Sequence, residues 1–259
     1  MDRPHRGPAG PARAGGAPVT ADLRAAAAAP GTAKIIEARN LEKSFGPTPA
    51  LRGASLGVRP GEIVAVMGPS GSGKSTLLHC LAGILVPDSG EVHVNGRRLD
   101  TLPDAERSAL RRTQFGFVFQ FGQLVPELTA EENVALPLLL GGTHRTAALQ
   151  TARQWFVRLD LDGLEKRRAG ELSGGQAQRV ALARGLVTEP TILFADEPTG
   201  ALDSLLGEQV MNMLTSSARQ QGTTVVLVTH EPRVAAYADR EVMVRDGRVS
   251  GLTMAKTAS

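Results

Sequence analysis

Cysteine is almost absent from this sequence, aromatic side chains are few, and no long apolar run occurs. The one cysteine among 259 residues, Cys80, excludes an internal disulfide and a cysteine-based metal site, as is usual in a reducing compartment. Cys80 falls in an apolar helical pattern, which predicts a buried thiol rather than a reactive one. The longest apolar stretch, residues 134–140, contains Pro137 and is far shorter than the roughly 18 residues of a membrane span. We therefore expect any membrane role to depend on a partner.

The sequence also lacks a strong excess of charge of one sign. The formal net charge is +3, from 29 basic and 26 acidic side chains, which is too small to indicate nucleic-acid binding. Part of that excess belongs to the N-terminal segment, because four arginines lie among the first 24 residues. We expect no nucleic-acid partner.

Three segments of different composition divide the chain. Residues 1–33 are rich in Ala, Gly, Pro and Arg and offer almost nothing to a core, so we predict a disordered tail. This segment lacks the apolar region of a secretory signal, and its Pro and Gly residues disfavour the alternative of a helical organelle transit peptide. We predict one folded domain over residues 34–252 and a short C-terminal tail over 253–259.

Apolar periodicity predicts an α/β fold for residues 34–252. Early strands are expected to be antiparallel, later strands alternate with helices, and residues 241–251 form a hairpin with an Asp-Gly turn. This order predicts a parallel core, an antiparallel β flank and a helical insertion at about 121–175. The expected strands cover residues 34–40, 62–68, 91–96, 115–120, 191–196 and 223–230, and the expected helices cover 74–85, most of 130–160, 176–187 and 205–220.

A phosphate-binding loop is the first motif that carries chemistry. GPSGSGKS fits G-x-x-x-x-G-K-[ST] at every fixed position and lies between a predicted strand and a predicted helix. Backbone N–H groups of such a loop surround a phosphate, Lys74 can reach the β- and γ-phosphates, and Ser75 can bind Mg²⁺. A plain glycine turn explains the lysine and serine poorly. The predicted nucleotide-binding residues here are Gly68, Pro69, Ser70, Gly71, Ser72, Gly73, Lys74, Ser75 and Thr76.

Polar residues also end three other apolar strands. Gln120 ends FGFVFQ, Asp196 and Glu197 end TILFADE, and His230 ends TTVVLVTH. Ligands of open α/β sheets collect at the carboxyl ends of the strands, so we expect these side chains to meet the phosphate loop. The alternatives are structural: Asp196 as the cap of a turn and His230 as the cap of the next helix.

A second glycine-containing segment, LSGGQ at 172–176, follows later in the chain. With ADEPTG at 195–200, ALD at 201–203 and VTHE at 228–231, it makes the sequence resemble the ATP-binding subunit of an ABC transporter. The resemblance covers residues from about 35 to 251. It implies a P-loop NTPase core of the ABC type, with a mixed parallel sheet, an antiparallel β flank and a helical subdomain.

The resemblance also implies roles for individual residues. Glu197 would be the general base, His230 would contact the γ-phosphate, and Gln120 and Lys74 would complete the catalytic group. Mg²⁺ would be associated with Ser75, Gln120 and Asp196. Further nucleotide contacts would come from Phe45 against adenine, from the signature residues Ser173, Gly174, Gly175 and Gln176 acting on a second subunit's ATP, and from Asp203.

For two of these residues, a purely structural role is an alternative to nucleotide binding. Phe45 matches the family's adenine-stacking aromatic, where tyrosine is commoner, but it could also be a core phenylalanine. Ser173 could serve only as the N-cap of a helix, and that role is compatible with binding a phosphate.

Within the family, the segment 115–140 and ADEPTGALDS resemble the ATPases of the macrolide-exporter and lipoprotein-release type. This resemblance implies a homodimer that binds ATP and Mg²⁺, pairs with an integral-membrane permease through the helical insertion, and lies in the cytoplasm against the inner face of the cell membrane. One alternative is the ATPase of a mechanical regulator, like the cell-division pair that uses a similar permease. A soluble ABC protein of translation or DNA repair fits less well, because such proteins usually carry two cassettes or a long coiled coil, and this sequence has one cassette and no sustained heptads.

Overall fold

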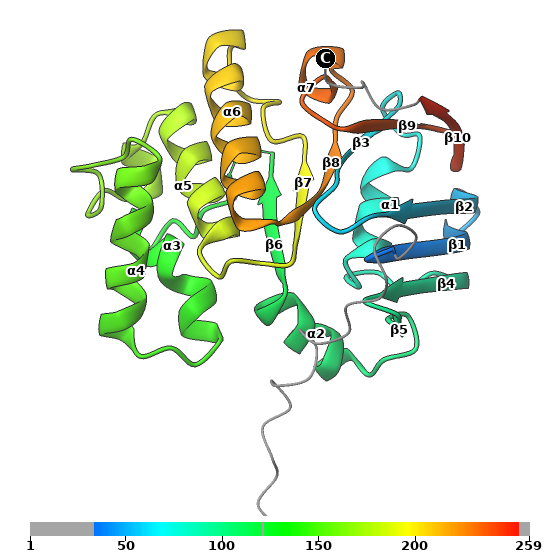
Figure 1. The fold of residues 1–259 in the computed structure, drawn as a ribbon, viewed down its shortest axis with the longest axis horizontal. Coiled ribbons are helices and arrows are strands. Elements are labelled where there is room, and N and C mark those ends of the chain that lie inside the picture. The colour runs from blue at the N-terminus through cyan, green and yellow to red at the C-terminus, as the bar shows by residue number, and fades with distance from the viewer. Residues whose placement is uncertain (1–33, 121, 254–259) are drawn as a thin grey trace, which may run out of the picture.

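Two sheets of different construction form the framework of the protein (Figure 1). The computed structural model describes residues 34–120 and 122–253, so the predicted N-terminal tail and all of the C-terminal tail beyond Thr253 lie outside the described residues. The smaller sheet is antiparallel, in the order β2-β1-β4-β5. Its strands are β1 (Ile36–Phe45), β2 (Thr48–Val58), β4 (Ser89–Val94) and β5 (Arg97–Arg98).

The larger sheet has six strands in the order β10-β9-β3-β8-β7-β6. Neighbouring strands from β9 to β6 run parallel, and β10 joins β9 as an antiparallel hairpin. Asp246 and Gly247 form the hairpin turn with φ angles of 48° and 74°, as an Asp-Gly sequence favours. The strands are β3 (Ile63–Met67), β6 (Phe115–Phe119), β7 (Ile192–Asp196), β8 (Thr224–Val228), β9 (Arg240–Arg245) and β10 (Arg248–Thr253).

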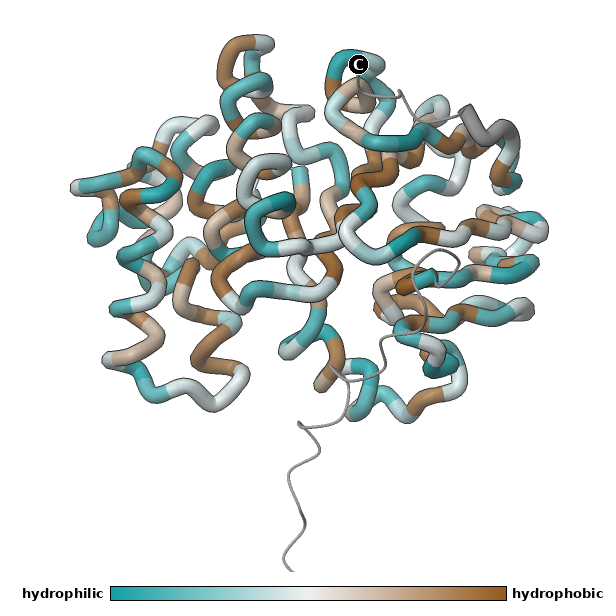
Figure 2. The backbone as a smooth tube through the Cα atoms, viewed as in Figure 1, coloured by the Kyte–Doolittle hydropathy of each residue, from teal (hydrophilic) through white to brown (hydrophobic). Residues whose placement is uncertain are grey.

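The central strands are buried on both faces, which explains their continuous apolar sequences. Every residue of β3 and β8 is buried. Alternate side chains enter two different cores: Val64 and Val66 pack with the smaller sheet, whereas Ile63 packs with the helices on the opposite face. Hydrophobic segments accordingly run through the centre of the molecule in Figure 2.

One helix lies between the two sheets. Helix α1 (Lys74–Leu81) follows β3 directly and buries Leu77, Leu78 and Leu81 in the core that the two sheets share. This packing holds the first turn of α1, and the loop before it, against the carboxyl end of β3.

Helices α3, α4, α5 and α6 cover the opposite face of the larger sheet and the region beyond it, toward the left of Figure 1. Helix α2 was not predicted, because none of its residues is buried and its sequence carries no apolar stripe. In the described residues, no helix combines the length and the hydrophobicity of a membrane span. The helices are α2 (Asp104–Thr113), α3 (Ala130–Leu140), α4 (Arg145–Arg158), the short 3₁₀ helix η1 (Ala169–Glu171), α5 (Gly174–Leu186), α6 (Ser204–Gln221) and α7 (Pro232–Ala235).

A buried carboxylate in α3 forms ion pairs with two other parts of the helical region. The Glu131 side chain in α3 is only 2% exposed and pairs with Arg153 of α4 and with Lys166 in the segment after α4. Burial opposes ionisation of Glu131, but the hydrogen bonds from Arg153 and Lys166 outweigh it, and the pKa of this carboxyl is lowered. The charged form of Glu131 therefore stabilises the folded state.

We expect Glu131→Gln to destabilise the protein by about 1–3 kcal/mol near neutral pH, because it removes an ionised hydrogen-bond acceptor from a buried site. A lowered pKa contributes stability above the unfolded-state pKa, and this contribution disappears as the pH falls through the folded-state pKa. The difference in urea midpoint between wild type and variant should shrink from pH 7 toward acidic pH. Glu127→Gln, at an exposed position, is the control and should change little. A difference that persists at low pH would contradict the proposed role of the charge.

Candidate nucleotide-binding site

The loop between β3 and α1 has the backbone that phosphate binding requires. Gly73, just before α1, has a φ of 103°, and a Cβ atom there would lie 2.4 Å from the carbonyl oxygen of Ala50 in β2. Only glycine fits this position, because both the conformation and the space exclude a side chain. The loop thus presents the N-terminus of α1, with its free N–H groups, to an anion.

Lys74 lies folded back on this loop. Its side chain is buried, and Nζ donates to the carbonyl oxygens of Gly68 and Pro69, each at 2.9 Å. The ammonium group is held close to the anion site by weak neutral acceptors. Phosphate oxygens are stronger acceptors for a lysine and can replace these carbonyl groups.

A pocket of about 600 Å³ lies over the loop and brings together most of the predicted residues. Of the residues predicted in the phosphate loop and at the strand ends, Gly68, Ser72 and Asp196 do not line this pocket. Ala50 is a lining residue that was not predicted, because a small apolar residue gives no chemical signal. The pocket is lined by Phe45, Ala50, Pro69, Ser70, Gly71, Gly73, Lys74, Ser75, Thr76, Gln120, Glu197 and His230.

Strand register explains why Gln120, Glu197 and His230 meet there. Phe119 of β6 pairs with Asp196 of β7, and Asp196 pairs with Val228 of β8. These parallel strands therefore end at one edge of the sheet, the edge to which β3 brings the phosphate loop. The three side chains follow their strands by one or two residues.

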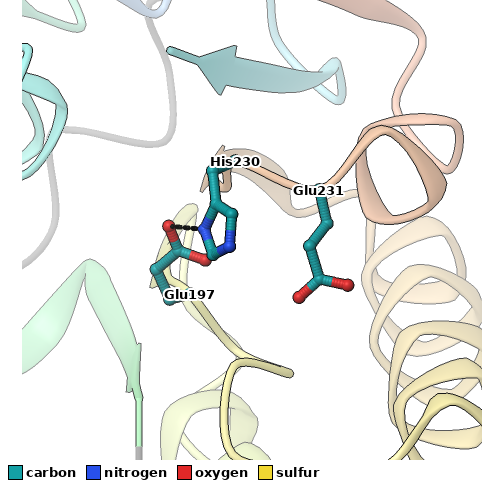
Figure 3. Close-up of side chains that lie close together, drawn as sticks. All are labelled: Glu197, His230 and Glu231. Atoms are coloured by element: carbon teal, nitrogen blue, oxygen red, sulfur yellow. Dashed lines mark hydrogen bonds and ion pairs between the residues drawn. The ribbon is translucent and has the colours of Figure 1, made fainter. Parts of the chain in front are cut away.

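Glu197 and His230 form a pair over the loop. Figure 3 shows the Nδ1 atom of His230 directed at Oε1 of Glu197, at 2.8 Å. Glu197 has a φ of 48°, and its N–H donates to the carbonyl oxygen of Val228, which anchors this left-handed residue to β8. The Glu197 side chain is 17% exposed and that of His230 is 58% exposed. The carboxylate of the pair is therefore largely shielded from solvent, whereas the imidazole is open to it. A carboxylate held this way can accept a proton from water.

Residues 51–200 match the family described as ABC transporter. The chain belongs to the ABC transporter family. A lipoprotein-releasing system ATP-binding protein, LolD, from Bordetella pertussis is 45% identical over 222 residues, which cover 84% of this chain and 96% of LolD. A macrolide export ATP-binding/permease protein, MacB, from Marinobacter nauticus is 43% identical over 219 residues, but these cover only 34% of MacB.

Solved cassettes of this family share the fold. A dimeric structure of the bacterial ABC transporter cassette MJ0796 superposes with a TM-score of 0.80 at 38% identity, covering 86% of this chain and all of the cassette. A second structure of that cassette, described as a post-hydrolysis state with ADP and Pi, gives a TM-score of 0.79. The predicted fold class is confirmed, and the chain is an ATP-binding, ATP-hydrolysing subunit.

The ABC signature residues lie outside the pocket that their own chain forms. Ser173 is the N-cap of α5: its Oγ accepts from the N–H of Gln176 at 3.3 Å, and Oε1 of Gln176 accepts from the N–H of Ser173 at 2.9 Å. The capping interpretation is therefore correct for this structure. Ser173 and Gly174 are nevertheless exposed, whereas Gly175 is buried against Leu206. The helix therefore begins with a turn that is exposed at Ser173 and Gly174 and that does not line the nucleotide pocket.

Asp203, another predicted nucleotide contact, also lies outside the pocket that its own chain forms. It is the N-cap of α6, where its Oδ1 accepts from the N–H of Leu206 at 3.0 Å. It lines a separate pocket of about 420 Å³ between α6 and α7. Within one chain, Asp203 therefore does not contribute to the nucleotide pocket.

Phe45 is an exposed aromatic side chain at the mouth of the pocket. It is the last residue of β1, is 52% exposed and lines the cavity. The alternative of a core phenylalanine is wrong, because β1 leaves the core before it ends. An exposed ring beside a phosphate loop offers a flat apolar face to a nucleobase.

The acidic groups suit a hard cation. Oδ1 of Asp196 and Oε2 of Glu197 are buried and have no hydrogen-bond partner among the described residues. Mg²⁺ prefers such oxygen ligands, so the donor set fits the ion. Ligand atoms of Glu197, His230 and Glu231 also lie within 4.8 Å of one another, but His230 and Glu197 already bond to each other.

Cys80 lies in α1, away from this chemistry. The thiol is buried, and burial raises its pKa to about 12, so the thiolate is scarce at neutral pH. The prediction of a buried cysteine is confirmed.

Gly73→Ala should abolish tight ATP binding, because the added methyl would clash with the Ala50 carbonyl and force the loop open. We expect at least about a ten-fold loss of affinity, the effect of 1.4 kcal/mol or more. Gly61→Ala is a matched control: Gly61 also has a positive φ, of 70°, but its Cβ would meet open space and it does not line the nucleotide pocket. It should cost only the left-handed penalty of about 1–2 kcal/mol in stability. Binding of a fluorescent ATP analogue and thermal melting of both variants test this difference, and equal affinities would contradict it.

Proposed function

We propose that the chain is the motor subunit of a transporter that extrudes lipids, lipoproteins or other molecules, and that it works as a homodimer bound to a separate membrane permease. One observation carries this proposal: the phosphate pocket is complete except for the signature turn, which is exposed elsewhere on the same chain. A second subunit would supply that missing turn. The names of the relatives support the export branch, since LolD belongs to a lipoprotein-releasing system and MacB is a macrolide exporter.

ATP would bind with its base against Phe45 and its phosphates in the loop. The N–H groups at the start of α1 and the ammonium group of Lys74 would receive the phosphate oxygens. Ser75, Gln120 and Asp196 would hold Mg²⁺, which neutralises phosphate charge when it is bound. The orphaned carboxylate oxygen of Asp196 supports this assignment.

Glu197 would act as the general base. Its carboxylate lies at the pocket edge, where it can orient a water molecule for in-line attack on the γ-phosphate. His230 is hydrogen-bonded to that carboxylate at 2.8 Å and can hold it in place until phosphate arrives. Lys74 and His230 would then stabilise the charge that develops on the γ-phosphate.

Ser173 and the N–H groups of Gly174 and Gly175 would cover the γ-phosphate bound to the partner subunit. These groups form the positive end of α5, so they suit an anion without a lysine of their own. Asp203 would lie at the same subunit interface. Two ATP molecules would be enclosed between two chains, and closing and reopening of the pair would drive the permease.

The permease would dock in a groove of about 610 Å³ between the sheet edge and the helical region. Phe117 and Phe119 stack in this region with ring centroids 5.8 Å apart, and Leu140, 61% exposed, borders it. An apolar groove of this kind suits a short helix from the membrane partner. Such docking would place the chain in the cytoplasm, peripheral to the inner face of the cell membrane.

A mechanical regulator that uses a similar permease is the second candidate. The ATPase pocket would be the same in both cases, so the permease decides between them. Purification of the chain with its native permease, followed by vesicle transport assays, distinguishes the two functions.

Glu197→Gln should stop turnover while it preserves ATP binding, because an amide cannot accept the proton of water. The trapped ATP should then hold two chains together, so size-exclusion chromatography with saturating MgATP should show a dimer. Glu127→Gln, at an exposed position outside the pocket lining, is the control and should retain turnover and reversible dimerisation. A Glu197→Gln variant that stays monomeric would contradict the two-chain mechanism.

Ser173→Arg should block hydrolysis yet leave the affinity of the monomer for ATP unchanged, because the signature turn acts on the partner's nucleotide. Thr129→Arg is a matched control: Thr129 caps α3 with the same kind of capping box but lies outside the pocket lining. Loss of a cap costs about 1 kcal/mol of stability in either variant. Turnover should fail in the first variant only. An equal loss of monomer affinity in Ser173→Arg would mean that the turn acts within its own chain.

A further inference from the structure

We propose that Gln178 and Arg184 are positioning residues that fasten helix α5 to the backbone on both sides of Gln120. We call these two side chains the α5 clamp. The inference rests on the proposed roles of Gln120 in the nucleotide pocket and of Ser173 on the partner's ATP. The clamp would make the position of Gln120 in one pocket depend on the nucleotide bound in the other.

Gln178 holds the residue before Gln120. Its side chain is buried, and Nε2 donates to the carbonyl oxygen of Phe119 at 3.1 Å. The same carbonyl oxygen accepts from the N–H of Gly122 at 3.2 Å, which closes a turn around Gln120. One oxygen thus connects the turn to α5.

Arg184 holds the residues after Gln120. Its guanidinium donates to the carbonyl oxygens of Gly122 at 2.7 Å and Gln123 at 2.9 Å. Burial lowers the pKa of Arg184, and among the described residues no carboxylate lies within ion-pairing distance of it. This charge is therefore directed entirely at main-chain oxygens, an arrangement that fixes backbone shape with charge-assisted hydrogen bonds.

The segment itself has little reason to keep this shape without α5. Gln123 has a φ of 45°, in the left-handed region that costs energy for a residue with a side chain. Gln120 is also confined on its other side, because a methyl group at Gly200 would come 2.7 Å from its Nε2 atom. The Gln120 side chain thus lies against Gly200, while the main chain on either side of it is bonded to α5, so a small movement of α5 would shift the amide.

One rigid helix therefore connects two functions. Ser173 caps α5, and both clamp residues lie within the 13 residues of that helix. When the signature turn closes on the partner's ATP, α5 must move as a unit, and the clamp carries the Gln120 backbone with it. Arg184 also borders the groove proposed for the permease. Docking of the permease there would therefore act on the same contact between α5 and the Gln120 backbone.

Hydrogen–deuterium exchange of the full-length chain tests the contact itself. Gln178→Leu and Arg184→Met should each accelerate exchange in peptides that cover Gly122 and Gln123. Arg184→Lys, which can still donate to one carbonyl oxygen, should give an intermediate rate. Arg179→Met is the matched control: Arg179 lies on the same helix and donates to the carbonyl oxygens of Leu159 and Asp160, away from the segment. Unchanged exchange in both clamp variants would overturn the clamp.

The Mg²⁺ dependence of ATP hydrolysis by the full-length chain tests the consequence. Both clamp variants should raise the half-saturating Mg²⁺ concentration by about ten-fold, as losses of outer-sphere support do. Arg179→Met should leave it unchanged even where it lowers the melting temperature equally, which separates positioning from general destabilisation. Gln120→Ala is the reference for a direct loss.

The outcomes separate this inference from the proposed function. If Gln120→Ala shifts the Mg²⁺ dependence and the clamp variants do not, positioning by the clamp is refuted. If Gln120→Ala has no effect, the metal role of Gln120 is refuted, and the exchange experiment alone decides whether the clamp holds the segment. Faster exchange together with a raised Mg²⁺ requirement in both clamp variants supports the inference.

Discussion

Burial of the central sheet on both faces is the constraint on which the rest of the structure depends. Strands β3, β7 and β8 can lose water from both faces only if they lie side by side between α1 on one face and the α5–α6 layer on the other. Parallel register then places all their carboxyl ends at one edge. Backbone N–H groups and a lysine from the loop after β3 meet there with two carboxylates at the end of β7 and a histidine after β8, although these three segments are far apart in the sequence.

The N-termini of α1 and α5 both present backbone N–H groups that suit an anion, but they face different surroundings. The start of α1 is enclosed by the loop after β3 and faces the pocket of its own chain. The start of α5 is capped by Ser173 but stays open to the surroundings. A lysine accompanies only the first, because one ammonium group suffices for a phosphate that both turns are proposed to hold. Division of one site between two copies, as proposed, would make hydrolysis depend on their association.

Short sequence motifs predicted the site better than periodicity predicted the fold. The loop at 68–75 and the four polar residues at three strand ends were identified because each lies beside a strand with a continuous apolar run. Helix α2 and strand β5 were missed, since a helix with no buried residue and a two-residue strand leave little periodic signal. Phe45 shows the same limit: its identity suggested both a core and a binding role, and only its place at the exposed end of β1 excluded the core.

The sequence by itself determined the chemistry: which side chains end the strands, where glycine is required, and that a second anion-binding turn lacks a lysine. These are local properties, set by residue type and spacing along the chain. Only the tertiary structure decided that His230 bonds to Glu197, 33 residues away, and that Gln178 reaches back 59 residues to the carbonyl of Phe119. Such contacts depend on strand order and helix packing, which follow from burying the whole core at once rather than from any single segment.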